Sequence, residues 1–392
     1  MGAGLVPHLR KGRIFAAMKK VGIVGGGQLG RMLLQAAANY PVETYVLEAD
    51  PQAPAAHLCH HFTQGPITDY DTLYRFGKGL DALTIEIENV NIDALEALEK
   101  EGVQVIPKPA VLRTIKSKIA QKNFYKQHDI PTAQFAITHN KVEIDAHTHL
   151  LPAVHKIAEG GYDGRGVVSI EKADEAENGF DGTAVLEKKI NIKKEIAQLV
   201  AVGIDGKTAL YPPVEMVFDK SWNQLDHQLC PAELSQEVLW KVEAVSLAVV
   251  RNLQSPGLFA VELFVDVAGN VLVNETAPRV HNSGHHTIEA HYSSQFDMVW
   301  RILLHLPLGN TKAILPSVMV NVVGAREANG PVHYQGLHDV LAMENAFVHL
   351  YGKAITKPGR KMGHVTILSA DKSDLTYKAN KVRHILQAVS KH

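Results

Sequence analysis

Two acidic residues, Glu262 and Glu275, stand in neighbouring apolar runs that are separated by a short polar stretch. This pattern is typical of two strands joined by a tight turn. If Ala268 and Gly269 form a two-residue loop, counting outward along the strands places Glu262 directly opposite Glu275. Facing carboxylates repel each other unless a cation lies between them, and Mg²⁺ prefers oxygen ligands when it also binds nucleotide phosphates. The pair therefore predicts a magnesium site, to which Asn274 can add a neutral oxygen; an exposed hairpin with solvated acids is the alternative.

A glycine-rich loop, residues 160–166, follows Lys156 at the end of a predicted strand. Glycines allow backbone N–H groups to surround an anion, and a lysine at the strand end adds a mobile charge for phosphoryl oxygens. A flexible hairpin turn is the plainer interpretation, because glycine-rich loops are common. Tyr162, Asp163 and Arg165 between the glycines favour a loop that binds phosphate.

A polar run, residues 276–286, comes directly after the second apolar strand. Ligands gather at strand ends in α/β folds, and Arg279 and His281 suit an anion. A zinc site is not expected here, because His285 and His286 are adjacent and no carboxylate or thiol with suitable spacing accompanies them.

The tail carries a further group of cations, among which Lys353 and Arg360 lie beside glycines. A solvated basic face is one interpretation of this group. The other is a phosphate clamp that reaches over the active site.

Residues 25–30 match the G-x-G-x-x-G fingerprint, and Glu48 ends the next predicted strand, where a ribose-binding acid would stand. An NAD-dependent oxidoreductase is therefore a rival function, and an inert nucleotide sensor is another. The fingerprint defines the fold better than the ligand, because any strand, glycine turn and helix needs small residues for close packing. Nothing downstream supplies a hydride-transfer site, whereas the middle of the chain supplies a phosphate and metal site.

The elements that must position these residues begin with an alternating pattern. Short apolar runs at residues 21–24 and 44–47 alternate with helical patterns at residues 28–39 and 93–100. Alternation of this kind predicts βαβ units on a parallel sheet.

The rest of the chain shows one basic helical stretch at residues 111–128, a strand at 152–156, a long helix at 235–252 and a strand-rich tail. These patterns predict four parts: an extension, 1–17; a Rossmann-like domain, 18–110; a middle domain, 111–322, with a lid over about 150–215; and a C-terminal domain, 323–392. The extension is predicted to be dispensable, with an amphipathic targeting arm as the alternative.

Composition limits the class of protein. At 392 residues the chain is long enough for two or three domains, and a net charge of -1 gives no broad field for nucleic acid or an anionic membrane. No apolar run approaches the length of a membrane span. Cys59 and Cys230 provide neither a disulfide framework nor a CxxC metal motif. We therefore expect a cytoplasmic protein with small-molecule substrates and with neither nucleic acid nor membrane as a partner.

At these residues the sequence resembles the N5-carboxyaminoimidazole ribonucleotide synthase family of the ATP-grasp superfamily. The resemblance covers nearly everything after Met18. It is carried by residues 25–32, 86–90, 160–166, 274–285 and 360–364. The combination of Gly-Gly-Tyr-Asp-Gly-Arg-Gly with Ala-Pro-Arg-Val-His-Asn-Ser-Gly-His is specific.

The resemblance implies an α/β ATP-grasp fold with an N-terminal Rossmann-like (pre-ATP-grasp) domain and a small β-rich C-terminal domain. It implies that ATP drives the condensation of bicarbonate with 5-aminoimidazole ribonucleotide, through carboxyphosphate, in de novo purine (IMP) biosynthesis. The products would be N5-carboxyaminoimidazole ribonucleotide, ADP and phosphate. The cofactors would be ATP and Mg²⁺, and the protein would form a homodimer. Another ATP-grasp ligase, such as a formate-dependent glycinamide ribonucleotide transformylase, is the nearest rival.

The resemblance also implies roles for individual residues. Those at ATP would be Lys118, Lys156, Gly161, Tyr162, Asp163, Gly164, Arg165, Gly166, Val167, Glu187, Lys188, Lys189, Ile190, Glu195, Asn274 and Glu275. The metal ligands would be Glu262 and Glu275, and the catalytic residues Arg279, His281 and Lys353. The ribonucleotide would be bound by Glu88, Tyr162, Asp163, Arg165, Lys353 and Arg360.

Three positions depart from the family pattern. Lys118 stands where an arginine is frequent, Phe218 where some members have a nucleotide-contacting histidine, and His155 where an apolar residue usually precedes the lysine. These departures bear on nucleotide affinity rather than on the reaction.

Overall fold

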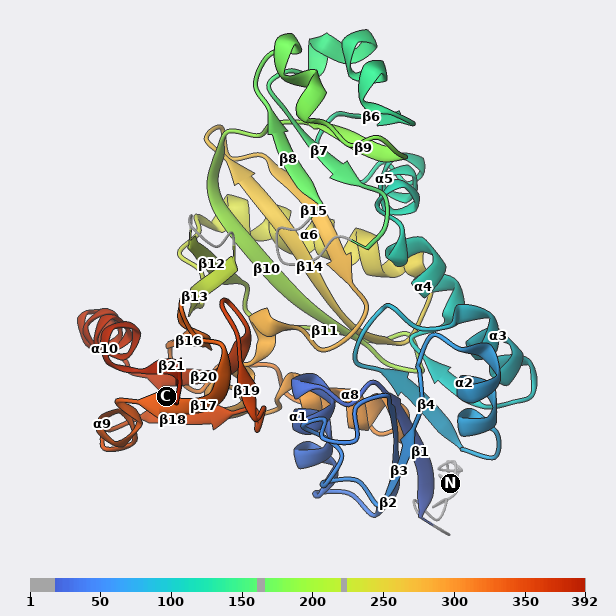
Figure 1. Ribbon diagram of the computed structural model, residues 1–392, viewed down its shortest axis with the longest axis vertical. Coiled ribbons are helices and arrows are strands. Elements are labelled where there is room, and N and C mark those ends of the chain that lie inside the picture. Colours follow the sequence, from blue (N-terminus) through green and yellow to red (C-terminus); the bar gives the residue numbers. More distant parts are fainter. Residues whose placement is uncertain (1–17, 161–165, 220–223, 392) are drawn as a thin grey trace, which may run out of the picture.

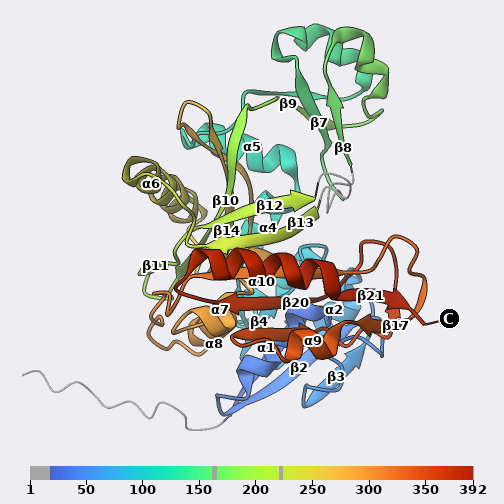
Figure 2. The same ribbon diagram turned by 90° about the vertical axis from the view of Figure 1, so that its left-hand side faces the viewer.

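The computed structural model describes residues 18–160, 166–219 and 224–391 (Figures 1 and 2). Its N-terminal part is a five-stranded parallel sheet with strand order β3-β2-β1-β4-β5. The strands are β1 (Lys19–Val24), β2 (Val42–Glu48), β3 (His61–Gln64), β4 (Ala82–Ile85) and β5 (Gln104–Ile106), and the helices are α1 (Gln28–Ala37), α2 (Tyr70–Gly77) and α3 (Ile92–Lys100). Strand β1 is fully buried over its apolar run, as expected for a parallel strand covered on both faces. The predicted βαβ arrangement is confirmed.

The basic stretch predicted as one helix over residues 111–128 is two helices, α4 (Pro109–Lys116) and α5 (Lys118–Gln127). Ser117 between them has extended backbone (φ -104°, ψ 121°), and its hydroxyl accepts a hydrogen bond from the N–H group of Ala120 at 3.3 Å. A serine cap satisfies an N–H group that has no partner within the first turn of a helix. The one-helix prediction was wrong because the helical pattern continues across this capping residue.

A small antiparallel sheet lies at the top of Figure 1, with strand order β6-β9-β7-β8. Its strands are β6 (Phe135–Thr138), β7 (Ala153–Ile157), β8 (Val167–Ile170) and β9 (Ala184–Lys188), and the 3₁₀ segments η1 (Lys141–Leu150) and η2 (Ala173–Asn178) lie between them in the chain. Lys156 stands near the end of β7, so the strand predicted before the glycine-rich loop is confirmed.

The largest sheet runs from the middle of the chain into the tail, in the order β15-β14-β10-β12-β13-β16-β20-β18, with β11 paired to β10. Its strands are β10 (Ile192–Val202), β11 (Thr208–Leu210), β12 (Val214–Asp219), β13 (Gln224–Cys230), β14 (Gly257–Asp266), β15 (Val271–Ala277), β16 (Ser317–Val323), β18 (Ala346–Leu350) and β20 (Lys361–Leu368). Helix α6 (Gln236–Leu253) packs on β10, β14 and β15. Because the tail strands extend this sheet, their side chains are held in fixed register with the middle of the molecule.

The hairpin of β14 and β15 pairs Glu262 with Glu275, as predicted, but reaches this pairing by another route. The N–H group of Asp266 donates to the carbonyl of Asn270 at 3.0 Å, so three residues, 267–269, lie within the turn instead of two, and Gly269 takes the positive φ (+80°) that such a turn needs. Asn274 is then an extra residue in β15, a β-bulge that shifts the pairing by one. The extra turn residue and the bulge each shift the strand register by one residue in opposite directions, so the two acids still face each other.

The end of the chain adds a second small sheet and two helices. They are β17 (Gly330–Gln335), β19 (Ile355–Thr356), β21 (Gln387–Ser390), α9 (Leu337–Leu341) and α10 (Lys372–Ile385). This part of the tail is rich in strands, as the sequence pattern predicts.

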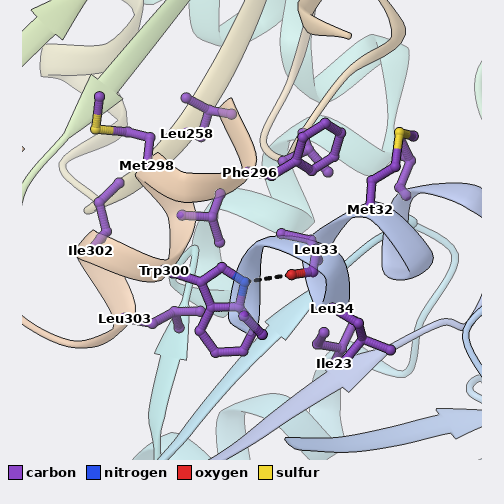
Figure 3. Close-up of a cluster of buried hydrophobic side chains, with 14 of the residues drawn as sticks. Ile23, Met32, Leu33, Leu34, Leu258, Phe296, Met298, Trp300, Ile302 and Leu303 are labelled. Carbon is purple, nitrogen blue, oxygen red and sulfur yellow. Dashed lines mark hydrogen bonds between the residues drawn. The ribbon is translucent and has the colours of Figure 1, made fainter. Parts of the chain in front are cut away.

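An apolar core joins the N-terminal part to the segment that follows β15 (Figure 3). Helix α8 (Gln295–Leu303), which comes after the short helix α7 (Thr287–Ala290), packs against α1. Trp300 is fully buried there, and its indole N–H group donates to the carbonyl of Leu33 at 2.7 Å. This contact holds the polar run after β15 against the N-terminal sheet. None of the helices that the structure describes combines the length and apolar composition needed to cross a bilayer.

Candidate active site

The facing acids of the hairpin, which with Asn274 make up what we call the metal pocket, differ in burial. The side chain of Glu262 is 15% exposed and that of Glu275 is 48% exposed. Burial raises the pKa of Glu262 well above its usual range, and the carboxylates of Glu275 and Glu195 raise it further. Asn274 donates from Nδ2 to Oε2 of Glu262 at 3.4 Å. Clustered acids of this kind repel each other and suit a hard cation such as Mg²⁺.

Lys156 is held beside these acids by two acceptors. Its Nζ lies 3.2 Å from Oε2 of Glu187 and 3.1 Å from Oδ1 of Asn274. Burial alone would raise the pKa of Glu187, yet the ammonium groups of Lys156 and Lys122 hold it below its usual range. The predicted phosphate lysine therefore has a defined position, with its charge directed toward the metal pocket.

Lys122 is a site residue that the sequence motifs did not reveal. Its Nζ is almost fully buried, 3.0 Å from Oε2 of Glu187 and 2.7 Å from the hydroxyl of Thr132. Burial lowers the pKa of Lys122 to about 8. The sequence does contain a signal for Lys122: it lies four residues after Lys118 on helix α5, and residues four apart share a helix face. Lys118 reaches the same pocket, 3.6 Å from Oε2 of Glu275.

Arg279 connects the strand end to the N-terminal part. Its Nε lies 2.9 Å from Oε1 of Glu88, in the loop after β4, and its Nη1 donates to the carbonyl of Val280 at 3.0 Å. Two residues predicted from distant motifs are thus brought together. The ion pair ties the segment after β15 to the loop after β4 of the N-terminal sheet.

His281 lies next to the metal pocket, with Nε2 3.6 Å from Oε1 of Glu262. The backbone N–H group of Ser283 donates to Nδ1 of His281 at 3.3 Å, which leaves the proton of a neutral imidazole on Nε2. Burial, followed by the charges of Arg279 and Lys361, lowers the pKa of His281 to about 3. The ring is therefore neutral at physiological pH and presents an N–H donor.

The predicted tail cations lie between β18 and β20: Lys353 precedes β19, and Arg360 directly precedes β20. Lys353 donates from Nζ to the carbonyl of Lys361 at 2.7 Å, and Arg360 donates from Nη1 to the carbonyl of Ile355 at 2.6 Å. Lys361 belongs to the predicted motif at residues 360–364 but was given no role there. Its charge lowers the pKa of both His281 and Glu262.

Comparisons with known proteins agree with this geometry. Three domain descriptions match in order: a ribonucleotide synthetase preATP-grasp domain at 18–116, an ATP-grasp domain at 123–296, and a phosphoribosylaminoimidazole carboxylase C-terminal domain at 317–378. The chain is 36% identical to the N5-carboxyaminoimidazole ribonucleotide synthase of Mycobacterium tuberculosis over 376 residues, which cover 93% of this chain and 87% of that protein. The chain belongs to the N5-carboxyaminoimidazole ribonucleotide synthase family.

Further relatives and solved structures support this placement. The synthase of Aquifex aeolicus is 33% identical, over 94% of this chain and 98% of that protein. The chain spans 65% of the length of the chloroplastic phosphoribosylaminoimidazole carboxylase of Vigna aconitifolia, at 34% identity. The crystal structure of the Thermotoga maritima synthetase aligns with a TM-score of 0.87 at 34% identity, over 95% of this chain and 100% of that one. The Aspergillus clavatus synthase in complex with ADP and 5-aminoimidazole ribonucleotide aligns with a TM-score of 0.84 at 29% identity. The alignment covers 93% of this chain and 99% of that one.

The synthase is accordingly an ATP-dependent ligase of purine biosynthesis that carboxylates 5-aminoimidazole ribonucleotide to its N5-carboxyamino form. The ATP-grasp fold with preATP-grasp and C-terminal domains, expected from the sequence, is confirmed.

The glycine turn of the synthase explains why its dinucleotide fingerprint is misleading. Glu86 accepts hydrogen bonds from the N–H groups of Gly27 at 2.7 Å and Gly30 at 2.5 Å, and Glu48 accepts one from Gly26 at 3.0 Å. These N–H groups are the ones that a Rossmann fold offers to a pyrophosphate. Because the chain's own carboxylates occupy them, the turn is a packing feature, and the oxidoreductase interpretation is set aside.

A group of buried rings links the active-site loop of the synthase to its tail. The ring of His285 lies 4.9 Å from that of His364, which stacks on His349 at 4.5 Å. The hydroxyl of Tyr351 is 3.0 Å from Nδ1 of His364, and Nε2 of His349 is 2.6 Å from Oε1 of Glu289. These contacts hold β18 and β20, which flank the loop that carries Lys353, against the loop after His281.

The remaining predicted residues are placed less centrally or lie outside the described ranges. The glycine-loop residues Gly161, Tyr162, Asp163, Gly164 and Arg165 fall outside the described residues. Gly166 precedes β8 and Val167 begins it, while Lys188 ends β9. Lys189 pairs with Glu171 at 2.5 Å. Ile190 precedes β10, and Glu195 lies on β10. Of the departures, His155 is fully buried and bonds Thr138 at 2.8 Å, and Phe218 packs beside the cluster around Met216.

Proposed function

We propose that the synthase performs its carboxylation in two steps at the pocket between Glu262, Lys156 and Arg279. In the first step a bicarbonate oxygen attacks the γ-phosphorus of ATP, so that ADP leaves and carboxyphosphate forms. In the second step the exocyclic amine of the ribonucleotide attacks the carboxyl carbon, phosphate leaves and the amine loses a proton. The supporting observations are that Lys156 of β7 bonds Asn274 beside the facing acids of the hairpin, and that Arg279, just after β15, pairs with Glu88 of the N-terminal part.

Glu262 and Glu275, with Asn274 beside them, are the residues that would hold Mg²⁺. The fit rests on geometry and donor chemistry: the two carboxylates face each other across the hairpin, and the amide of Asn274 lies 3.4 Å from Glu262, so oxygen donors of the kind that Mg²⁺ prefers gather at one place. Bound there, Mg²⁺ would neutralise charge on the phosphate oxygens of ATP.

Lys156 would contact the transferred phosphoryl group, since Glu187 and Asn274 fix its ammonium next to the metal pocket. The ATP-binding set that we propose otherwise follows the family resemblance. It comprises Lys118, the loop from Gly161 to Val167, Glu187 to Ile190, and Glu195. Lys122 joins it as the residue that keeps Glu187 charged and in place.

Arg279 and His281 would bind bicarbonate and the carboxyphosphate formed from it. A guanidinium paired with Glu88 and a neutral imidazole that presents N–H are both donors, which suits an anion whose charge grows during phosphoryl transfer. Pre-positioned donors of this kind require little rearrangement during the reaction.

The ribonucleotide would lie between the N-terminal part and the tail, where Glu88, Lys353 and Arg360 were expected. Its phosphate needs additional cations, because those near the metal pocket are engaged with ATP. Lys361 supplies one, since its charge already acts on His281 and Glu262. We assign Lys361 to this group alongside the six predicted residues, Glu88, Tyr162, Asp163, Arg165, Lys353 and Arg360.

We also propose that the synthase is a cytoplasmic homodimer. Cys59 and Cys230 are both free thiols, which suits a reducing compartment. The dimer rests on the family resemblance. Analytical ultracentrifugation should show a particle of two chains.

The test of the proposed reaction is release of ADP by the full chain with Mg²⁺, bicarbonate and 5-aminoimidazole ribonucleotide. ADP release should need all three, and omission of Mg²⁺ should abolish it. Formate with glycinamide ribonucleotide should not replace the substrates, and NADH should not be consumed. ADP release with formate, or none with bicarbonate, would overturn the proposal.

A further inference from the structure

A buried glutamine outside the active site holds the backbone of His281. Gln295, the first residue of α8, is fully buried, and its Oε1 atom accepts a hydrogen bond from the N–H group of His281 at 2.9 Å. Its Nε2 atom donates to the carbonyl of His281 at 2.8 Å and to Nδ1 of His285 at 3.1 Å. Both N–H groups and the oxygen of one side-chain amide therefore bond the loop that carries His281.

Gly284 leaves the space that this amide occupies. The nearest atoms to a Cβ atom at Gly284 would be Oε1 of Gln295 at 2.4 Å and Cδ of Gln295 at 2.5 Å. Atoms in a close-packed interior do not approach so closely, so a side chain at this position would displace the amide. The contact with Gln295 thus explains the glycine in the motif at residues 274–285.

Ser283 orients the ring of His281 from within the same loop. Nδ1 of His281 lies 2.9 Å from the hydroxyl of Ser283 and 3.3 Å from its N–H group. Because Ser283 moves with His281, these bonds do not fix the distance of the ring from Glu262. Gln295 belongs to another element, and it holds the main chain from which the ring extends.

Helix α8 gives Gln295 a fixed position, because Trp300 of the same helix is buried in the apolar core shared with α1 (Figure 3). The main chain of His281 is thereby tied to the packing against the N-terminal part. The same part supplies Glu88, the partner of Arg279. Both proposed anion-binding side chains are therefore positioned from the N-terminal part.

We propose that Gln295 is a positioning residue for the carboxylation, which sets the place of the Nε2–H donor of His281 beside Glu262. The inference rests on the anion-binding role proposed above for His281. Gln295 acts through the main chain of His281 and does not itself bind substrate. A displacement of about 1 Å in a catalytic group can lower a rate about a hundredfold, so a residue in this role affects turnover.

Gln295→Met tests this role, because methionine has a similar length and lacks the amide. The N–H group of His281 loses its acceptor, whereas its carbonyl keeps the bond from the N–H group of Gly284 at 2.9 Å. We expect kcat to fall about tenfold or more and the KM for bicarbonate to rise several-fold, with the KM for ATP within about twofold of wild type. Steady-state ADP release by the full chain measures all three.

NMR of histidine-labelled protein supplies a readout that loss of stability alone would not change. Burial, followed by the charges of Arg279 and Lys361, lowers the pKa of His281 to about 3, so the wild-type ring should stay neutral between about pH 5 and 8. In Gln295→Met the ring should leave its buried place and gain a proton at the lower end of this range. The variant His281→Gln assigns the signal.

Gln198→Met is the matched control. Gln198 is also fully buried, on β10, and its amide donates to the carbonyl of Tyr211. Both replacements should lower the urea midpoint, but Gln198→Met should keep wild-type bicarbonate kinetics and a neutral His281. Gly284→Ala displaces the amide of Gln295 without removing it and should reproduce the effects of Gln295→Met. If circular dichroism shows that Gln295→Met is not folded, Gly284→Ala decides.

The outcomes separate this inference from the proposed function. Loss of bicarbonate turnover in His281→Gln, together with wild-type kinetics and a neutral His281 in folded Gln295→Met, would overturn the positioning role alone. Equal kinetic losses in Gln295→Met and Gln198→Met would overturn it as well, because a general loss of core packing would explain both. Wild-type turnover in His281→Gln would overturn the anion-binding role of His281 and this inference with it.

Discussion

Asn274 and Glu275 are adjacent in β15, yet the side chains of both reach the metal pocket. Asn274 contacts Glu262 and Lys156, and Glu275 faces Glu262 across the hairpin. Consecutive residues of a regular strand point to opposite faces, but a β-bulge at Asn274 removes this alternation. One inserted residue therefore supplies the pocket with an amide as well as a second carboxylate.

Replacement of Glu262 by glutamine should stabilise the metal-free protein while lowering kcat by more than about tenfold. The pKa of Glu262 is raised in the folded state, so its contribution to stability is complete below the ordinary value of 4.5 and is lost as pH rises through the folded pKa. Metal-free wild type should lose stability over this interval, and Glu262→Gln should lose less. Urea unfolding in EDTA at several pH values measures the difference.

Magnesium should reverse this pH trend in wild type, because the cation competes with the proton on Glu262. Apparent Mg²⁺ affinity should rise with pH in wild type and remain flat in Glu262→Gln. The exposed variant Glu99→Gln is the control and should change stability by less than about 0.5 kcal/mol. Identical pH profiles for wild type and Glu262→Gln would contradict the buried-acid argument.

Lys122→Met should raise the KM for ATP several-fold and lower the free energy of unfolding by about 1–3 kcal/mol. The change leaves Glu187 buried with Lys156 as its one remaining charge partner among the described residues, so Lys156 is drawn toward Glu187 and away from the phosphate. Lys126→Met, an exposed change on the same helix, is the control. Steady-state kinetics and urea unfolding measure both effects, and an unchanged KM would mean that Lys122 only supports packing.

Lys353→Ala should leave ATP binding close to normal and lower kcat/KM for the ribonucleotide by about tenfold or more. The reason is its place in the tail, where Lys353 bonds the carbonyl of Lys361. Isothermal titration with a nonhydrolysable ATP analogue should give an unchanged affinity. Steady-state kinetics with varied ribonucleotide should give the lowered kcat/KM. Equal loss of both would indicate that the tail has unfolded.

Lys361→Met and Arg360→Met should differ although the residues are adjacent. Removal of Lys361 takes a positive charge from His281 and Glu262, so kcat should fall by about tenfold, and the pKa of His281 should rise. Removal of Arg360, whose guanidinium bonds the carbonyl of Ile355, should act mainly on the KM for the ribonucleotide. NMR titration measures the pKa of His281, and steady-state kinetics measure kcat and KM for both variants. Equal effects of the two replacements on kcat would refute the predicted difference between Lys361 and Arg360.

Much of the architecture was predictable because the information is local. The buried apolar run of β1, the serine cap of α6 and the alternation along β14 each reflect the preferences of a few neighbouring residues, and the structure contains all three elements. Local patterns also sufficed to pair Glu262 with Glu275, although the predicted two-residue loop was wrong.

The tertiary structure decided what depends on partners far apart in the chain. It placed Glu86 on the amides of the glycine turn, which excludes a pyrophosphate, and it selected Lys122 to hold Glu187. It also brought the amide of Gln295 to both backbone groups of His281. Local preferences specify strands and helices, whereas the partner of a buried charge or ligand atom is decided by which side chains the packed sheets bring within bonding distance.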